Sequence, residues 1–393
     1  MEAENMKDTY ISDTIKYIGA DDTTLDLFES QYRIPNGVSY NSYVILDEKV
    51  AVMETIDARK TEEWLANLQE ALAGRTVDYL VISHLEPDHA ANIKCLADLY
   101  PEARLVLSAK AKTMLPQFFE IAQLDDRCEV VKEGDVLELG THKLMFVMAP
   151  MVHWPEVMVE YEMTEKILFS ADGFGKFGAL SAEEDWTDEA RRYFINIVGK
   201  YGVQVQGLLK KAAGLDIQMI CPLHGPILKE NLGFYIDKYL TWSSYTPEEE
   251  GVLVACASIH GNTKAAAEKM VEVLKAQGAQ NVVFTDLTRD DMAQAVADAF
   301  RFGKVVLAAA SYDGGVFPPM EDFLHRLAHK NYQKRVIGLI ENGSWAPCAA
   351  RGMKGILEGM KEISVCENTV SIKSVMKSQD LAKMEELAKE ILA

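Results

Sequence analysis

Short apolar runs that alternate with turns and a few helical stretches recur over residues 1–248. Runs of this kind, bounded by polar and turn-forming residues, predict buried or half-buried strands. The stretch therefore predicts a sheet-rich α/β layer structure. The runs are SYVILDE, KVAVMETID, DYLVIS, ARLVLSA, KLMFVMAP and KILFSAD.

The pattern changes near residue 248. Beyond it, the strand-like segments GVLVACAS, NVVFTDLT and GKVVLAAAS alternate with the helical segments TKAAAEKMVEVLKAQG and DDMAQAVADAF. This alternation is typical of a doubly wound parallel sheet. The joining segment YLTWSSYTPEEEG is polar, contains Pro247 and carries three consecutive glutamates, so it predicts a surface linker. We therefore predict two domains, residues 1–248 and 249–393.

The charge of −20 falls mostly on the first predicted domain. Residues 1–248 hold 23 Lys and Arg against 41 Asp and Glu, whereas residues 249–393 hold 17 against 19. Because this charge repels nucleic acid and anionic lipid, we expect neither as a partner. No run approaches the roughly 18 apolar residues of a membrane helix. The opening MEAENMKDTYISD does not resemble an export signal, so we expect a cytoplasmic protein.

Four residues that commonly bind metals lie in the segment DYLVISHLEPDHAANIKCLADL. Its apolar strand ends just before His84 and a helix is predicted to begin about Ala90, which leaves Glu86, Asp88 and His89 on the connection. Residues two apart in an extended chain point the same way, so His84 and Glu86 can bind one ion while Asp88 reaches a second. The spacing suits two metals. His89 is either a ligand or a hydrogen-bonding partner of a ligand.

Three further apolar runs each lead to a single residue of ligand type: His153, Asp172 and His224. A lone histidine at a strand end is more often a hydrogen-bonded structural residue than a ligand. Four such strand ends in one domain favour a metal site.

This constellation resembles the metallo-β-lactamase superfamily, whose αββα sandwich binds metals at strand ends through an HxHxDH motif and later His, Asp and His residues. The motif here reads H-L-E-P-D-H, so Glu86 replaces the second histidine. Three carboxylates and three imidazoles form a harder, more anionic donor set than zinc hydrolases usually offer, and such a set suits iron. Redox chemistry is therefore favoured over hydrolysis.

The second domain opens with a predicted strand that runs into a polar loop and then a helix. Small polar side chains and the free N–H groups of a helix N-terminus bind phosphate. Neither GxGxxG nor GxxxxGK[ST] occurs at this loop, which disfavours a dinucleotide or a nucleoside triphosphate there. The loop residues are Ser258, Ile259, His260, Gly261, Asn262 and Thr263.

Two Gly-containing loops follow later strands and each carries an aromatic residue. Ligands of doubly wound sheets bind beyond the carboxyl ends of the strands, where these loops and the phosphate loop meet. A ring held between them, with its phosphate at residues 258–263, resembles FMN in flavodoxins. Alternatively, both loops are plain turns with surface aromatics. Their residues are Ser311, Tyr312, Asp313, Gly314 and Gly315, and Asn342, Gly343, Ser344 and Trp345.

The two constellations in this order resemble the flavodiiron proteins over essentially the whole chain. The resemblance implies a metallo-β-lactamase-like diiron domain followed by a flavodoxin-like FMN domain. It also implies one iron on His84, Glu86 and His153, a second on Asp88 and His224, and Asp172 as the bridging carboxylate. His89 matches a motif histidine that is often not a direct ligand in this family. The ligands implied are therefore His84, Glu86, Asp88, His153, Asp172 and His224.

The resemblance further implies an oxidoreductase that reduces O2 to water, NO to N2O, or both, and protects against oxygen or nitrosative stress. It implies a head-to-tail homodimer or a dimer of such dimers, in which each FMN lies beside the partner's irons. The sequence ends without a rubredoxin CxxCG or flavin-reductase segment, so we expect a separate electron donor, with rubredoxin the commonest and coenzyme F420 an alternative.

The sequence departs from the family in two places. Gly173 stands where many relatives have a bulkier residue, and Cys256 and Ala257 precede the phosphate loop where Tyr-Asp or Tyr-Gly is common. Two other functions stay open at this point. One is a zinc-dependent hydrolase fused to a flavodoxin-type electron-transfer module. The other is a flavodoxin-type electron carrier whose first domain holds no metal.

Overall fold

The computed structural model describes residues 9–393, and the chain divides into two compact units. The first unit comprises residues up to 194 and residues 203–240. The second comprises residues 195–202 and 241–393. The short segment 195–202 thus belongs with the second unit although it lies far from it in sequence. Among the described residues, none of the helices is long and apolar enough to cross a membrane.

The first sheet of the first unit is mixed, with the order β1-β6-β7-β8-β9-β10. Strands β1, β6 and β7 pair antiparallel, and β7 to β10 pair parallel. The apolar runs predicted as strands supply most of it. The strands are β1 (Ile15–Tyr17), β6 (Tyr43–Leu46), β7 (Val50–Met53), β8 (Tyr79–Ile82), β9 (Arg104–Ser108) and β10 (Cys128–Val131).

The second sheet has the order β11-β12-β13-β14-β15. Its first four strands form antiparallel pairs, and β14 pairs parallel with β15. Two two-stranded ribbons, β2 with β5 and β3 with β4, complete the strands of this unit. Their bounds are β2 (Ala20–Asp22), β3 (Leu27–Phe28), β4 (Tyr32–Arg33), β5 (Val38–Tyr40), β11 (Val136–Glu138), β12 (Lys143–Met148), β13 (Met158–Glu162), β14 (Ile167–Phe169) and β15 (Met219–Cys221).

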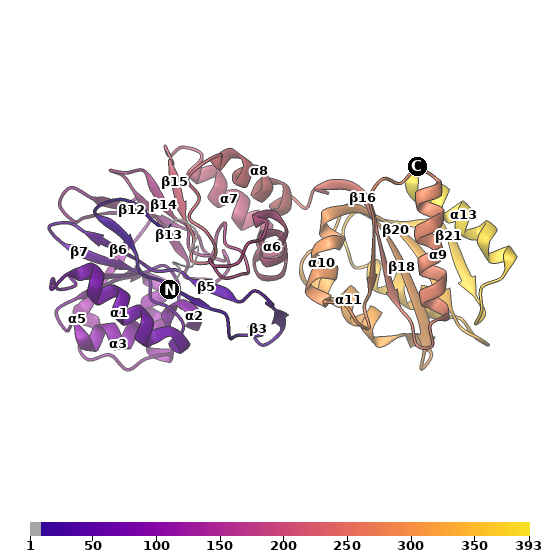
Figure 1. The fold of residues 1–393 in the computed structure, drawn as a ribbon, viewed down its shortest axis with the longest axis horizontal. Coiled ribbons are helices and arrows are strands. Elements are labelled where there is room, and N and C mark those ends of the chain that lie inside the picture. Colours follow the sequence, from indigo (N-terminus) through magenta and orange to yellow (C-terminus); the bar gives the residue numbers. More distant parts are fainter. Residues whose placement is uncertain (1–8) are drawn as a thin grey trace, which may run out of the picture. The chain divides into compact units, whose positions relative to one another are not determined.

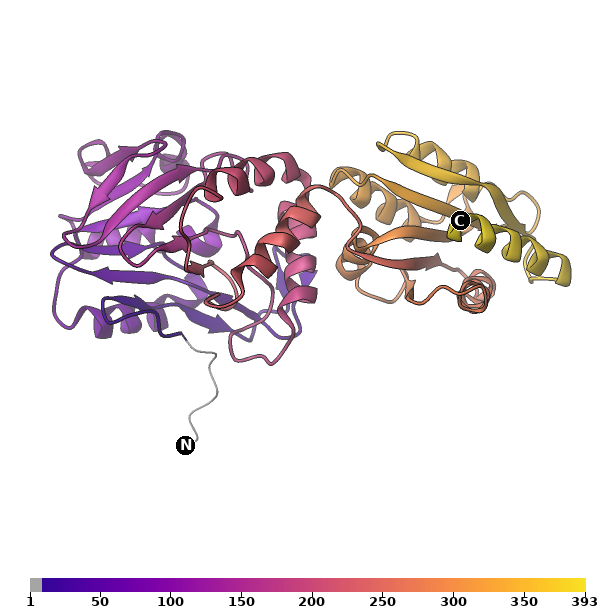
Figure 2. The same cartoon turned by 90° about the horizontal axis from the view of Figure 1, so that it is seen from above.

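The two sheets form separate layers, the first in indigo and purple and the second in magenta (Figure 2). Val81 and Val106 of the first sheet and Phe146, Met158 and Phe169 of the second belong to one buried cluster. Burial of each such side chain contributes about 1.5–3 kcal/mol. The predicted αββα sandwich is confirmed.

Helices flank these sheets on their outer faces (Figure 1). In α1, Trp64, Leu68 and Leu72 recur at helical spacing and are buried, as expected of an amphipathic helix. The helices are α1 (Thr61–Leu72), α2 (Pro87–Ala90), α3 (Ile93–Leu99), α4 (Ala109–Met114), α5 (Leu124–Arg127), α6 (Trp186–Tyr193), α7 (Gly202–Ala212) and α8 (Leu232–Ser243), with a π-helical segment at Phe194–Val198.

The second unit is built on one parallel sheet of order β17-β16-β18-β20-β21. Numbered along the chain without the short β19, these five strands have the order 2-1-3-4-5, which is the flavodoxin-like order. The predicted doubly wound sheet is therefore confirmed. The strands are β16 (Glu249–Ala257), β17 (Val282–Asp286), β18 (Phe302–Tyr312), β19 (Gly315–Val316), β20 (Arg335–Asn342) and β21 (Ile363–Ile372). The helices are α9 (Asn262–Ala276), α10 (Met292–Arg301), α11 (Pro318–His329), α12 (Ala349–Leu357) and α13 (Ser378–Leu392).

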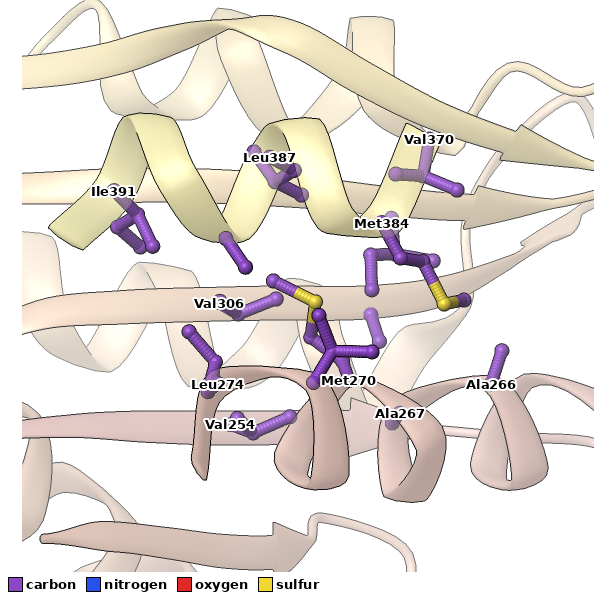
Figure 3. Close-up of a cluster of buried hydrophobic side chains, with 14 of the residues drawn as sticks. Val254, Ala266, Ala267, Met270, Leu274, Val306, Val370, Met384, Leu387 and Ile391 are labelled. Atoms are coloured by element: carbon purple, nitrogen blue, oxygen red, sulfur yellow. The ribbon is translucent and has the colours of Figure 1, made fainter. Parts of the chain in front are cut away.

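The core on one face of this sheet lies beneath α9 and α13. Figure 3 shows Met270 and Leu274 of α9 and Met384 and Leu387 of α13 meeting over Val306 of β18. All five side chains are inaccessible to solvent. This packing fixes the start of α9 against the carboxyl ends of β16 and β18, where the candidate phosphate loop lies.

Candidate metal centre and cofactor pocket

The predicted metal ligands lie just beyond strand ends of the first unit, five of them on loops and Asp88 in the short helix α2. Ile82 ends β8 just before His84, and His153 lies five residues beyond the end of β12. In the parallel pair β14–β15, Phe169 faces Cys221. Asp172 and His224 each follow three residues later, so the register of the sheet brings them to the same edge.

One prediction about this loop is wrong. The helix begins at Pro87 rather than about Ala90, so Asp88 and His89 lie in the first turn of α2 and not on an extended connection. Proline is favoured at the first helical position because its missing N–H would be unpaired there anyway. The helical turn, rather than alternation along an extended chain, therefore separates Asp88 from Glu86.

The first ligand group contains His84, Glu86, His153 and Asp172, whose ligand atoms lie within 4.8 Å of one another. Nε2 of His153 lies 2.9 Å from Oε2 of Glu86 and 3.0 Å from Oδ2 of Asp172. Nε2 of His84 lies 3.3 Å from the same Asp172 oxygen. Two imidazoles and two carboxylates thus converge on one point.

The second group contains Asp88, His89 and His224. Oδ2 of Asp88 lies 3.2 Å from Nε2 of His224 and 3.5 Å from Nε2 of His89. The two imidazole nitrogens lie 3.0 Å apart. Oδ1 of Asp172 lies 3.9 Å from both of them. Asp172 therefore directs one carboxylate oxygen toward each group.

The residues fit a pair of cations. Several buried atoms of the two groups have no hydrogen-bond partner among the described residues, although buried polar atoms are normally paired. They are both oxygens of Asp88, Oδ1 of Asp172, both ring nitrogens of His84, Nδ1 of His89 and Nε2 of His153. A cation in each group would satisfy the carboxylate oxygens and the one nitrogen of each imidazole that faces the group, and the mixture of imidazoles and carboxylates is a donor set that suits iron.

The pKa directions agree with a densely charged, dry cluster. Burial raises the pKa of Asp172, but the neighbouring His84 and His153 outweigh burial and hold that pKa well below its usual range. Burial and the charge of Asp88 raise the pKa of Glu86 to about 7. Burial lowers the pKa of His89 to about 3, so this imidazole is neutral and able to bind a cation.

Two buried glutamates behind His84 were missed by the sequence reasoning. Glu54 accepts a short hydrogen bond from the backbone N–H of Ser83, and Ser83 Oγ donates to Glu160 at 3.2 Å. Burial raises the pKa of Glu54 to about 7 and that of Glu160 well above its ordinary value. For Glu160, the signal in the sequence was a glutamate on the same face of the strand MVEYE as the core residue Met158.

An aromatic wall and one carbonyl position His224. Its Nδ1 donates to the backbone oxygen of Ser39 at 2.7 Å, which leaves Nε2 free for a cation. The rings of Phe28, Tyr40 and Tyr193 lie 5.5, 6.0 and 5.4 Å from its ring. These aromatic residues were also missed, because nothing in their local sequence distinguishes them from ordinary core residues.

A second site, a pocket of about 590 Å³, lies at the carboxyl edge of the sheet in the second unit. Most of the predicted FMN-binding residues line it: Ile259, His260, Asn262, Thr263, Ser311, Tyr312, Asp313, Gly314, Asn342, Gly343, Ser344 and Trp345. Ser258, Gly261 and Gly315 do not line it, but Ser258 Oγ accepts from the N–H of Gly261 at 3.1 Å and Gly315 pairs with Tyr312. Arg351 and Ser374 line it as well and were missed.

The phosphate end of this pocket is formed by the start of α9. Gly261 caps the helix with φ of +90°, a conformation that favours glycine, and no atom lies within 4 Å of the position its Cβ would occupy. Asn262 and Thr263, the first two residues of this long helix, line the pocket. At the other end of the pocket, Tyr312 is 46% exposed and Trp345 is 90% exposed. Their rings offer two flat aromatic surfaces to a planar ligand.

The chain is similar to known proteins along nearly its whole length. Residues 38–225 match the family model described as ODP family beta lactamase. The nitric oxide reductase of Moorella thermoacetica is 27% identical over 98% of both chains.

Two solved structures are similar along nearly the whole chain. The rubredoxin oxygen:oxidoreductase of the anaerobe Desulfovibrio gigas has a TM-score of 0.90 at 25% identity, and the match covers 98% of this chain and 97% of that one. The flavodiiron protein of Giardia intestinalis has a TM-score of 0.89 at 23% identity over 98% of both chains.

Proposed function

This chain is a flavodiiron protein, and we propose that it reduces dioxygen to water, nitric oxide to nitrous oxide, or both, at two iron ions that receive electrons through FMN. The observation that carries the proposal is Asp172, whose two carboxylate oxygens face two separate ligand groups. A carboxylate in that position is suited to bridge a pair of cations. The names of the related reductases support the same reaction class.

We assign His84, Glu86 and His153 to one iron, Asp88 and His224 to the other, and Asp172 to both. The 3.0 Å approach of the His89 and His224 nitrogens supports His89 as a further ligand of the second iron. When bound, the iron pair supplies Lewis acidity and two electrons, and reduced FMN supplies two more.

The electron count explains why both sites are needed. One O2 takes up four electrons and four protons to give two waters, whereas two NO take up two electrons and two protons to give N2O and one water. The residues of this chain hold the ions and exclude bulk water. His84 and His224 are fully buried, and the aromatic wall around His224 closes that side of the cage.

For the flavin, we propose that the N–H groups at the start of α9 and the side chains of Asn262 and Thr263 bind the phosphate, and that Tyr312 and Trp345 contact the ring. The missed Arg351 adds a positive side chain to the pocket. One phosphate-binding helix start suits a mononucleotide.

The deciding experiment reduces the purified protein fully without oxygen and follows consumption of O2 and of NO separately by electrode. Iron and FMN per chain are quantified in the same sample. We expect two irons and one FMN per chain and turnover of at least one gas. The zinc-hydrolase alternative is not favoured by the comparisons. Protein that carries zinc, cleaves esters and consumes neither gas would restore it.

We also propose a separate protein or cofactor as the electron donor, rubredoxin first and coenzyme F420 second. The name of the Desulfovibrio gigas relative supports rubredoxin. Stopped-flow reduction of FMN by each reduced donor distinguishes them, because only the physiological donor should reduce FMN at a rate that keeps pace with gas consumption.

The head-to-tail homodimer, or a dimer of such dimers, is likewise proposed on the family resemblance. Mixing tests it: one chain lacks iron through a ligand substitution, and the other lacks FMN through a pocket substitution. In random head-to-tail dimers, half the dimers are mixed and each has one complete pair of sites, so about a quarter of the wild-type activity should return. No recovery after subunit exchange contradicts this arrangement.

A further inference from the structure

An apolar cavity of about 270 Å³ lies in the first unit, separate from the ligand cage. One wall is the outer face of the second sheet, where each of four neighbouring strands contributes one side chain: Val147, Val159, Leu168 and Ile220. Successive residues of a strand point to opposite faces. The neighbours of these four residues along the strands belong to the core between the sheets, so the cavity lies on the other side of the sheet from that core.

Helices α7 and α8 form the opposite wall. Val205, Leu208, Leu209 and Ala212 of α7 line the cavity, together with Ile236 of α8. These side chains leave a void that the helices do not fill, although protein interiors are normally close-packed.

The lining offers water almost no partner. Ser170 and Tyr239 are the only polar side chains among the lining residues. Ser170 Oγ donates to the carbonyl of Gly173 at 2.6 Å, and the Tyr239 hydroxyl accepts from the N–H of Phe174 at 2.5 Å. A buried water needs two to four polar partners, and cavities lined by aliphatic side chains stay dry and bind apolar guests such as xenon. The cavity therefore suits a small apolar molecule.

The cavity runs from the surface toward the metal ligands. At its outer end, Leu215 and Ile217 are half-exposed and lie before the start of β15. At its inner end lie Val152, directly before the ligand His153, and Gly173 with Phe174, directly after the ligand Asp172.

We propose that this cavity takes up the diatomic gas from solution and holds it beside the loops that carry His153 and Asp172. The inference rests on the proposed function, because O2 and NO are the substrates it names. Both molecules are small and weakly hydrated, so they gain dispersion contacts in a dry aliphatic void and give up few hydrogen bonds to enter it.

Xenon is the probe, because it enters dry aliphatic cavities and has no chemistry with iron or flavin. Crystals of the holoprotein are exposed to xenon gas, and ¹²⁹Xe NMR measures binding in solution. We expect a xenon atom between α7 and the β14–β15 pair. This measurement is independent of whether the protein reduces any gas.

Ala212→Phe, which places a ring in the void, is the main variant. It should abolish xenon binding and lower kcat/KM for the gas about threefold or more while kcat at saturating gas stays unchanged, since the loss is in substrate delivery. Gln204→Phe, on the exposed side of the same helix, is the matched control and should change neither value. Leu209→Ala makes the opposite change, so it should bind more xenon without lowering kcat/KM.

The outcomes separate this inference from the proposed function. No xenon in the cavity overturns the inference even if the protein reduces O2 or NO. Xenon binding with an unchanged kcat/KM in Ala212→Phe also overturns it, because the void is then only a loosely packed layer. Wild-type protein that binds xenon but consumes neither gas overturns the proposed function, and with it the role of the cavity in delivering substrate.

Discussion

The metal cage of the first unit and the flavin pocket of the second are built on opposite plans. The cage gathers ionisable side chains that are at most 14% exposed, and it directs them at two points. The pocket is an open edge lined by loop backbone, small polar groups and two exposed aromatic residues.

This difference predicts how each site fails. In the cage, each ligand supplies a large share of the binding free energy of an ion, and removing one leaves other buried charges unpaired. In the pocket, many weak contacts share the binding free energy, so removing one weakens binding without abolishing it. Substitutions in the two sites should therefore differ in size and should not affect each other's cofactor.

The largest effect is expected from Asp172→Asn. The change keeps the size of the side chain but removes the charge that both ligand groups share, so iron content should fall and gas reduction should drop at least about 100-fold. Elemental assay, flavin absorbance and gas electrodes measure this. FMN content should stay unchanged, and the exposed Asp216→Asn should behave as wild type. Two irons per chain in Asp172→Asn would rule out the shared role of this carboxylate.

A smaller effect is expected from His89→Asn. If His89 binds the second iron, its loss should lower the affinity for that iron by about 10- to 100-fold, while the first iron stays bound. Titration of metal-free protein with Fe²⁺ under anaerobic conditions resolves the two steps. His329→Asn, in the second unit, is the control. Equal affinity in His89→Asn and wild type would show that His89 only contacts a ligand.

Next in size is Trp345→Ala. Loss of one aromatic contact with the flavin ring should weaken FMN binding by about tenfold, equivalent to roughly 1–2 kcal/mol. Equilibrium dialysis or flavin fluorescence gives the dissociation constant, and iron content should not change. Tyr10→Ala removes an exposed aromatic residue of the first unit and should leave FMN affinity unchanged. An unaltered constant in Trp345→Ala would mean that the ring binds elsewhere.

The smallest effect concerns stability away from both sites. His142 Nδ1 lies 3.1 Å from Glu162, and this contact raises the pKa of His142. Burial raises the pKa of Glu162, but His142 and backbone N–H groups outweigh burial and lower it. The contribution of His142 to the free energy of unfolding is present at low pH, and it is lost as pH rises through the raised pKa of this histidine. The contribution of Glu162 is present at high pH, and it is lost as pH falls through the lowered pKa of this glutamate. Both are therefore present between about pH 4.5 and 6.5.

We expect His142→Asn to lower the free energy of unfolding by about 1–2 kcal/mol at pH 5.5 and by less at pH 9. Urea unfolding of metal-loaded protein at the two pH values measures the difference. The exposed His325→Asn serves as control. A loss that is equal at both pH values would show that packing, rather than the ion pair, accounts for it.

The sequence predicted the fold and the residues that cluster in the cage because both follow from local patterns. Each apolar run forms a strand, and the end of a strand fixes where the next side chain lies. The helical turn at Pro87 was missed because proline after a strand fits an extended loop as well. Glu54, Glu160 and Arg351 were missed because long-range packing brings them to the sites. Residues 195–202 were missed for the same reason. They belong to the second unit although they lie between two stretches of the first, and a single domain boundary in the sequence does not describe this arrangement.

The exposure of Trp345 gives the protein a built-in optical reporter. Of its five tryptophans, Trp64, Trp186 and Trp242 are buried and Trp154 is half-buried, so the long-wavelength edge of the emission comes largely from the 90% exposed Trp345. A flavin against that indole should quench this edge and leave the short-wavelength emission in place. Occupancy can then be followed during dilution, storage or crystallisation without any added label.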